Sequence, residues 1–293
     1  MAGHEGHGSE DGAGVTAASV PAADPAPLPR RIGLRLAYEG TRYSGWQVQP
    51  GRTTVQGVVT GAVHAVSREQ VLVRGSSRTD AGVHALDQIA AFTTHGPLPA
   101  DVWMRALNAN LPADVTVVAA RELAADFDPV AAAVSKLYRY RIHDAAWRPV
   151  LARHLVWRWR GLLDVAAMEA AAAALVGEHD FTSFETTPST RLSKVRTIHG
   201  LSVRRHTGPD DAAGAEVWIE VEGNGFLHNM VRIIAGTLVM VGAGRRPAAW
   251  AAAALAARSR AAAGPTAPPQ GLMLVSTRLD QLAWPDPPTH SAP

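Results

Sequence analysis

Alternating apolar and polar positions predict strands in two stretches of this chain. In residues 31–38 one face of the strand is apolar, and it consists of Ile32, Leu34, Leu36 and Tyr38. The second alternating run consists of Val134, Lys136, Tyr138, Tyr140 and Ile142. Other apolar runs predict strands near residues 71–75, 87–94, 115–123, 197–205, 215–223 and 272–279.

Helical spacing of apolar residues follows the first predicted strand, behind a cap at Thr54. The residues with this spacing are Val55, Val58, Val59, Ala62, Val63 and Val66. Further predicted helices lie near residues 99–109, 164–176, 227–241 and 248–258. Strands and helices thus alternate in two successive sets, which predicts an α+β chain with two similar halves, residues 31–125 and 126–280.

The two ends of the chain lack this periodicity. Residues 1–30 are rich in Gly, Ala, Pro and Ser, so we predict a disordered tail. Residues 281–293 contain four prolines and are predicted to form a loose C-terminal tail.

Composition narrows the classes of protein that the chain can belong to. With 293 residues and 47% hydrophobic content, the chain can bury one large core or two modest ones. It has no cysteine, which excludes disulfides and thiolate metal sites. No apolar run is long enough to span a bilayer, and the N-terminus lacks the pattern of a secretory signal. We therefore expect a soluble cytoplasmic protein.

The net charge of +2 conceals an uneven distribution. Residues 1–29 contain four acidic and no basic residues, so the rest of the chain carries +6. Nearly all of this positive charge is arginine, because Lys136 and Lys194 are the only lysines. Arginine binds phosphate in a bidentate manner and stacks on bases, so an RNA partner is one interpretation. Solvated surface arginines would give the same count.

The most informative segment is Ser77-Arg78-Thr79-Asp80-Ala81-Gly82-Val83-His84-Ala85, which lies between two apolar runs. Asp-Ala-Gly predicts a tight turn, because Asp binds its own backbone and Gly accepts positive φ. A loop held by flanking strands is a common place for reactive groups. By itself, Asp-Ala-Gly is more typical of an ordinary surface turn, so the prediction depends on the whole nine-residue string.

This string resembles the catalytic signature of the TruA family of tRNA pseudouridine synthases, Gly-Arg-Thr-Asp-Ala-Gly-Val-His. The resemblance covers roughly residues 31–280 and includes further strings in the family's order. These are Tyr38–Gln47, Thr54–Gly57, Ala106–Asn108, Lys136–Tyr140, Asp180–Phe184, Val195–Ile198, Gly223–Arg232 and Gly271–Leu274. Each string alone is weak evidence, whereas all of them in order are specific.

The resemblance implies two ferredoxin-like halves with a joined, mainly antiparallel sheet, flanking helices and a central RNA-binding cleft. It also implies a homodimer that converts uridines 38, 39 and 40 of the tRNA anticodon stem-loop to pseudouridine. This reaction breaks the N1–C1′ bond, turns the freed uracil and remakes the bond through C5. Nothing enters or leaves, so we expect no cofactor and no metal.

Asp80 is the expected catalytic residue, acting as nucleophile or base at C1′, C2′ or C6, and the sequence leaves these three routes open. In a dry pocket desolvation raises the pKa of a carboxyl, so Asp80 needs a cation nearby. The resemblance assigns this role to Arg232, and its apolar neighbours favour partial burial. The alternative places Arg232 on the polar face of a helix, where it would bind phosphate.

Tyr138 is implied to stack on the target uracil and to take the C5 proton, directly or through water. Tyr140 falls on the same strand face, so spacing alone does not separate the two tyrosines. A base inside a stem must be flipped out, and Arg78 is expected to fill the vacated stack or hold the flipped nucleotide. Its alternative role is to brace the loop.

His84 and His228 lack carboxylate neighbours at metal-ligand spacing and are predicted to be structural. Three positions depart from the family pattern: Ser77 replaces a glycine, Ala131 lies in an altered RNA-contacting stretch, and Met273 replaces a tyrosine. These departures motivate a rival hypothesis, a catalytically idle RNA-binding protein on the same fold. Retention of the Asp, Tyr and Arg argues against this rival.

Overall fold

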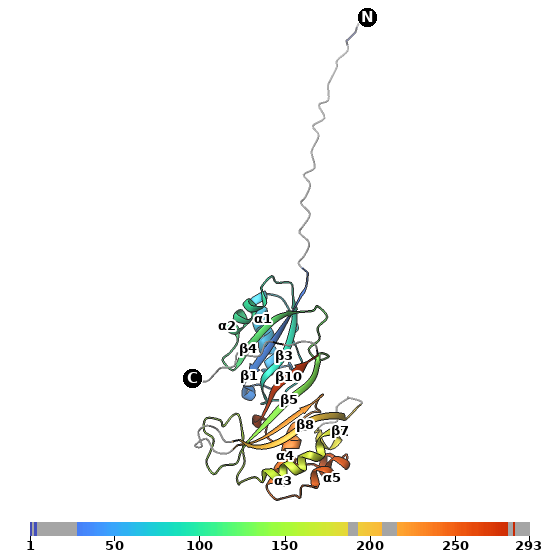
Figure 1. The fold of residues 1–293 in the computed structure, drawn as a ribbon. Coiled ribbons are helices and arrows are strands. Elements are labelled where there is room, and N and C mark those ends of the chain that lie inside the picture. Colours follow the sequence, from blue (N-terminus) through green and yellow to red (C-terminus); the bar gives the residue numbers. More distant parts are fainter. Residues whose placement is uncertain (2, 5–27, 187–192, 207–215, 281–283, 285–293) are drawn as a thin grey trace.

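The structure of the protein is a computed structural model that describes residues 1, 3–4, 28–186, 193–206, 216–280 and 284 (Figure 1). Most of the predicted tail at residues 1–30 lies outside the described residues, as does the predicted tail at residues 281–293 apart from Trp284. No helix within the described ranges is long and apolar enough to cross a membrane.

The first half of the described chain alternates strands with two helices. Its elements are β1 (Arg30–Tyr38), α1 (Val55–Ser67), β2 (Arg74–Gly75), β3 (His84–Thr94), α2 (Ala100–Asn110) and β4 (Val115–Leu123). Thr54 caps α1 as predicted, because its side chain accepts a hydrogen bond from the Gly57 amide.

The second half follows the same kind of alternation with more strands. Its elements are β5 (Ala133–His143), β6 (Trp157–Arg158), α3 (Val165–Ala172), β7 (Gly177–Asp180), β8 (Val195–His206), β9 (Glu216–Gly223), α4 (Met230–Gly242), α5 (Trp250–Ala256) and β10 (Leu272–Leu279). Buried side chains from both halves form one continuous hydrophobic core.

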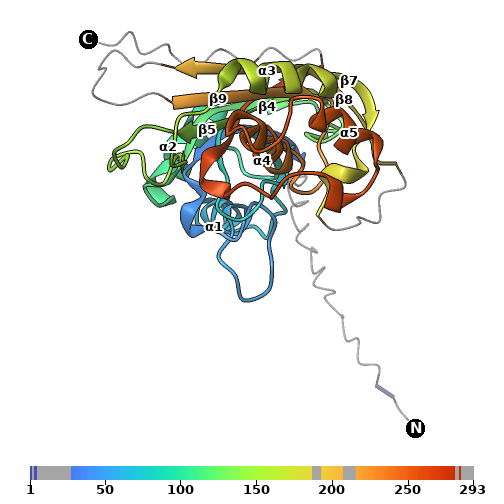
Figure 2. The same cartoon turned by 90° about the horizontal axis from the view of Figure 1, so that it is seen from below.

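All the strands among the described residues join in one mixed sheet. Eight of them follow the order β4-β1-β3-β10-β5-β9-β8-β7, while β2 pairs with β3 and β6 pairs with β5. Most neighbours are antiparallel, and the halves meet where β3 runs parallel to β10. The last strand of the chain therefore lies at the middle of the sheet (Figure 1). Helices α1 and α4, one from each half, lie on the same side of this sheet (Figure 2).

The predicted strands at residues 115–123 and 272–279 are confirmed to the residue. The predicted strand at residues 71–75 is wrong for its first three residues, since β2 contains only Arg74 and Gly75. The Val73 carbonyl is bound by the Gln56 side chain instead of by a neighbouring strand. A hydrogen bond from a polar side chain thus takes the place of the strand pairing that the apolar run predicted.

Two helices in the second half begin or end at other residues than the sequence predicted. The helix predicted to reach residue 176 ends at Ala172 and continues as a 3₁₀ turn over Ala173–Leu175. The helix predicted from residue 227 begins at Met230, because Asn229 has a left-handed backbone conformation with a φ of 61°. This late start places Arg232 in the first turn of α4.

Candidate active site

Asp80 comes from the loop between β2 and β3, residues 76–83, which we call the Asp80 loop. Gln88 on β3 is fully buried, and its side-chain amide binds the Ser77 N–H at 3.1 Å and the Ser77 carbonyl at 2.6 Å. The same amide accepts a hydrogen bond from the Ser76 hydroxyl. Because moving Gln88 would leave several buried polar groups unpaired, the start of the Asp80 loop is fixed.

The middle of the Asp80 loop lies against the segment that follows β1. The main-chain N–H of Trp46 donates to the Thr79 carbonyl at 3.0 Å, and the Tyr38 and Thr79 hydroxyls are 2.8 Å apart. Gly45 has a φ of 86°, and a Cβ there would lie 2.7 Å from the Thr79 carbonyl oxygen. Only glycine permits both features, so this position is part of what holds the turn at Asp80.

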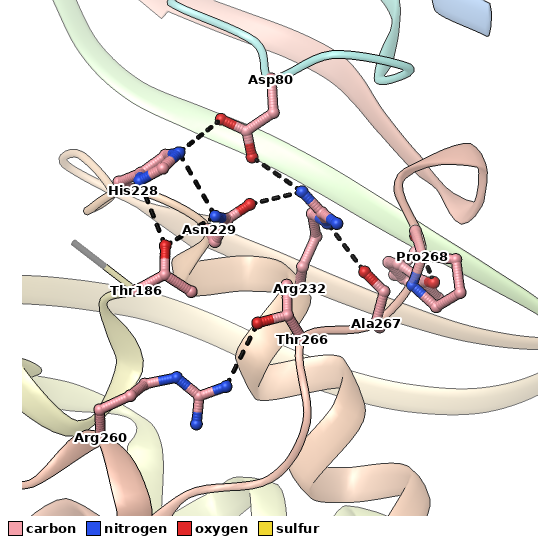
Figure 3. A network of polar contacts seen from close by, with 10 residues as sticks. Asp80, Thr186, His228, Asn229, Arg232, Arg260, Thr266, Ala267 and Pro268 are labelled. Carbon is pink, nitrogen blue, oxygen red and sulfur yellow. Dashed lines mark hydrogen bonds and ion pairs between the residues drawn. The ribbon is translucent and has the colours of Figure 1, made fainter.

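Arg232 reaches Asp80 from the first turn of α4 (Figure 3). Its Nη1 lies 3.4 Å from Asp80 Oδ2, and the exposed fractions of the two side chains are 15% and 23%. The structure thus joins two predicted site residues that are 152 positions apart in the sequence. Since the pair is largely withdrawn from water, the attraction between its charges is stronger than at an open surface.

The Arg232 guanidinium is held by Asn229 and by residues 264–268, which we call the crossing segment. The Asn229 side-chain oxygen accepts a hydrogen bond from Nη1, and its amide nitrogen donates to the Thr186 hydroxyl at 2.7 Å. On the other side, Nε donates to the Ala267 carbonyl at 2.8 Å (Figure 3). A positive φ at Asn229 costs energy, and strain of this kind often marks a functional position.

The crossing segment, residues 264–268, approaches α4 closely. A Cβ added to Gly236 would lie 1.9 Å from the Pro265 carbonyl oxygen, so the two main chains are in direct contact. This contact requires glycine on α4 and brings the Ala267 carbonyl within reach of Arg232.

His228 faces the second carboxylate oxygen of Asp80. Its Nε2 lies 3.8 Å from Asp80 Oδ1, and its Nδ1 lies 3.2 Å from the Thr186 hydroxyl oxygen (Figure 3). The prediction of a structural histidine fits His228 only in part, because the hydrogen-bonded ring is 49% exposed and lies beside Asp80. When protonated, it would place a second positive charge next to the carboxylate.

Tyr138 on β5 completes the described part of the site. It is 8% exposed, and its ring meets Phe226 edge-on at a centroid distance of 5.2 Å. Burial raises the pKa of Tyr138 well above its usual value, and the nearby Asp80 charge raises it as well. The phenol therefore stays protonated at neutral pH.

Tyr140, which spacing alone could not distinguish from Tyr138, has a structural role. It is fully buried, and its hydroxyl donates to the Pro268 carbonyl at 2.6 Å. This hydroxyl is therefore used within the fold.

Arg78 is exposed on the Asp80 loop. It forms no hydrogen bond or ion pair with any other residue in the part of the chain that the structure describes. It does not brace the loop, which was the alternative to a functional role. The structure does not join Arg78 to the Asp80–Arg232 pair, and its guanidinium is available to an external partner.

His84 has the predicted structural role. Its Nδ1 accepts the Gly40 N–H at 2.9 Å, and its Nε2 lies 3.2 Å from the Gln270 carbonyl, so Nε2 carries the proton. Burial lowers the pKa of His84 below its usual value and keeps the ring neutral. Within the described ranges, no three or more His, Cys, Asp or Glu side chains gather in a group suited to a metal ion.

Of the three departures from the family pattern, only Ser77 lies at the site. Met273 lines a hollow of about 550 Å³ together with Arg139, whose side chain points to the opposite face of β5 from Tyr138. Ala131 is exposed just before β5. Neither of these two positions adjoins the Asp80–Arg232 pair.

Three side chains that support the site were not predicted from the sequence: Gln88, Asn229 and Thr186. Gln88 gave a signal that was available, since it is a polar residue directly before the apolar run 89–92. Asn229 and Thr186 gave none, because their importance arises from the left-handed turn before α4 and from contacts between distant segments.

Comparison with known proteins gives one consistent result. The family model described as tRNA pseudouridine synthase matches residues 36–129 and 171–280. A protein of Myxococcus xanthus named tRNA pseudouridine synthase A is 46% identical over 244 residues, covering 83% of this chain and 90% of the relative. Proteins with the same name from Geotalea uraniireducens and Pseudomonas aeruginosa are 46% and 43% identical, each over 84% of this chain and over 98% and 84% of the relatives.

Proposed function

Because this chain belongs to the tRNA pseudouridine synthase family, we propose that Asp80 is its catalytic residue and that its targets are uridines 38, 39 and 40 of the anticodon stem-loop. The protein is an isomerase that acts on uridine in tRNA. The observation that supports Asp80 most strongly is its position, on a fixed loop and 3.4 Å from the Arg232 guanidinium.

Asp80 has the chemistry that the isomerisation requires. A carboxylate beside the sugar and base can attack C1′ or C6, or take a proton from C2′. Arg232 places a positive charge 3.4 Å from this carboxylate. Because a positively charged neighbour is already oriented by Asn229 and Ala267, little rearrangement is needed when charge develops in the reaction.

Tyr138 and Arg78 are proposed to bind the substrate. The Tyr138 phenol is protonated, so it serves as a stacking surface and hydrogen-bond donor. It can take up the C5 proton only if it gives its own proton to another acceptor. Arg78 is exposed and unpaired among the described residues, which suits a side chain that enters the space left by a flipped base.

We also propose that the chain has two ferredoxin-like halves, residues 31–125 and 126–280, and that it acts as a homodimer. The strand order supports the first proposal. The first half has the spatial order β4-β1-β3-β2 and the second half β10-β5-β9-β8. With the four strands of each set numbered along the chain, both halves have the order fourth, first, third, second. The homodimer follows from the resemblance, and light scattering of the purified protein that shows only a monomer would overturn it.

The function is tested by incubating the purified protein with an unmodified tRNA transcript and mapping pseudouridine at each position. We expect product at positions 38, 39 and 40, and loss of product at each position when that uridine is replaced by cytidine. Product elsewhere in the tRNA would overturn the assigned targets. Tight, salt-sensitive tRNA binding without product would instead support the idle RNA-binding protein.

A further inference from the structure

His228 is a polar side chain of the site to which the proposed function gives no role. Its ring is 49% exposed, and its Nε2 lies 3.8 Å from Asp80 Oδ1, which is too far for a hydrogen bond. Arg232 lies against the other carboxylate oxygen, Oδ2. Within the described ranges no hydrogen bond reaches Oδ1, so this oxygen and the exposed ring beside it are both open to a substrate.

A chain of hydrogen bonds orients the His228 ring (Figure 3). The Asn229 side-chain oxygen accepts from Arg232, so the Asn229 amide nitrogen is the atom that donates to the Thr186 hydroxyl at 2.7 Å. The hydroxyl proton of Thr186 is then available to His228 Nδ1, 3.2 Å away. A neutral ring that accepts at Nδ1 carries its proton on Nε2, and this N–H faces Asp80.

The other tautomer of His228 satisfies these groups less well. In it, Nε2 would accept from the Asn229 amide nitrogen, 3.3 Å away. Its lone pair would then be turned toward the negative charge of Asp80, and the Thr186 hydroxyl proton would have no acceptor among the described residues. A proton on Nε2 avoids both costs.

We propose that the His228 Nε2–H and Asp80 Oδ1 together bind the ribose 2′-hydroxyl of the target uridine. This inference rests on the proposed function, which places the sugar beside Asp80. A 2′-hydroxyl can accept one hydrogen bond and donate another, so it can accept from Nε2–H while it donates to the carboxylate. Two atoms 3.8 Å apart can both contact one oxygen at about 2.8–2.9 Å.

Other groups of a nucleotide fit this position less well. A phosphate would meet the negative charge of Asp80 at close range. A uracil carbonyl oxygen can accept from His228 but has no proton to give to the carboxylate. The 2′-hydroxyl is also the group that distinguishes RNA from DNA, so His228 is assigned to the selection of ribose over deoxyribose.

A cycle that combines a substitution in the protein with one in the RNA tests this proposal. The substrate is a tRNA with uridine at position 39 and no uridine at positions 38 and 40, made with either uridine or 2′-deoxyuridine at position 39. Pseudouridine formation is measured in single turnover at saturating enzyme, so a partial loss of folded protein does not lower the rate. Any effect of the 2′-hydroxyl on the glycosidic bond itself is the same for every protein and cancels in the cycle.

The unchanged protein is expected to act about 10- to 100-fold more slowly on the 2′-deoxyuridine tRNA, which lacks a hydroxyl bound to a charged group. His228→Phe keeps a ring but removes the N–H, and it should lower the rate on the uridine tRNA about five- to ten-fold. On the 2′-deoxyuridine tRNA the same substitution should change the rate less than about two-fold, since the hydroxyl is already absent.

Two further variants serve as controls. His228→Gln can place an amide N–H near the position of Nε2, so it should stay within about three-fold of the unchanged protein on the uridine tRNA. His95→Phe removes an exposed histidine at the opposite end of β3 from the Asp80 loop, and both rates should stay the same.

The outcomes separate this proposal from the proposed function. Equal losses by His228→Phe on both tRNAs, or no loss on the uridine tRNA, would overturn the role of His228 while the unchanged protein still forms pseudouridine. If the unchanged protein forms no product from the uridine tRNA, the assigned target is wrong and the proposal fails with it.

Discussion

The two sides of the site are built differently. The Asp80 loop is held by main-chain hydrogen bonds, by a buried glutamine and by a glycine in close contact. The residues that face it, His228 to Arg232, are held mainly by side chains that bind one another, and one of these, Asn229, has a strained backbone. One half of the chain thus fixes the carboxylate, and the other half holds a positive charge beside it mainly through side-chain contacts.

Because the two sides are held differently, we expect substitutions on them to have different effects on stability and activity. Changes on the Asp80 loop side remove buried hydrogen bonds and should lower stability together with activity. Changes on the α4 side alter charge and orientation beside the carboxylate, and they should lower activity with a smaller cost in stability.

Arg232→Gln should lower kcat for pseudouridine formation about 10²- to 10³-fold, because it removes the charge beside Asp80 and leaves the carboxylate partly buried and unpaired. Binding of tRNA should change less than about three-fold. Arg232→Lys is the matched control, since it keeps the charge but loses the guanidinium geometry, and it should fall in between. An Arg232→Gln protein with normal kcat and weak tRNA binding would favour the phosphate-binding alternative.

Gln88→Leu should lower the free energy of unfolding by about 2–4 kcal/mol and reduce kcat, because Ser76 and Ser77 lose their buried partner. Urea titration and single-turnover kinetics measure the two effects. Asn108→Leu is the control, since Asn108 makes a similar two-bond contact with the Val117 main chain away from Asp80. It should reduce stability and spare kcat, and equal losses of kcat in both variants would contradict the assignment.

His84 gives the stability of the folded protein a predictable dependence on pH. Its lowered pKa means that the folded protein binds fewer protons than the unfolded chain below the usual histidine pKa of about 6.5. Stability should therefore decline as the pH falls below about 7, with a slope from this group of at most about 1.4 kcal/mol per pH unit. His84→Gln should be less stable at pH 7.5 and show a shallower decline, whereas an unchanged slope would exclude His84 as the cause.

Arg78→Ala should weaken tRNA binding about five-fold and reduce the salt dependence of binding by about one counterion. Because Arg78 has no partner among the described residues, the unfolding midpoint should not change. Arg105→Ala, which removes an exposed arginine paired with Asp101 on α2, serves as the control for charge alone. Equal weakening by both substitutions would show that Arg78 contributes only general electrostatic attraction.

Local patterns were sufficient to predict most of the strands and helices and the segments that carry Asp80, Tyr138 and Arg232. Periodicity failed where side chains replaced main-chain pairing, as at Val73, and where one residue left the helical region, as at Asn229. Spacing alone could not distinguish Tyr138 from Tyr140, and only the family resemblance selected Tyr138, since the difference depends on whether a distant carbonyl, that of Pro268, meets the hydroxyl. Such contacts arise only when separate segments fold together.

The most direct test of the account is single-turnover pseudouridine formation by Asp80→Asn, measured with tRNA binding by the same protein. The substitution preserves the shape of the side chain and removes the negative charge that Arg232 faces. We expect tRNA affinity within a few-fold of the unchanged protein and a rate lower by at least about 10³-fold, as for the loss of a reacting carboxylate. A rate within about ten-fold of the unchanged protein would show that the Asp80 carboxylate does not perform the chemistry.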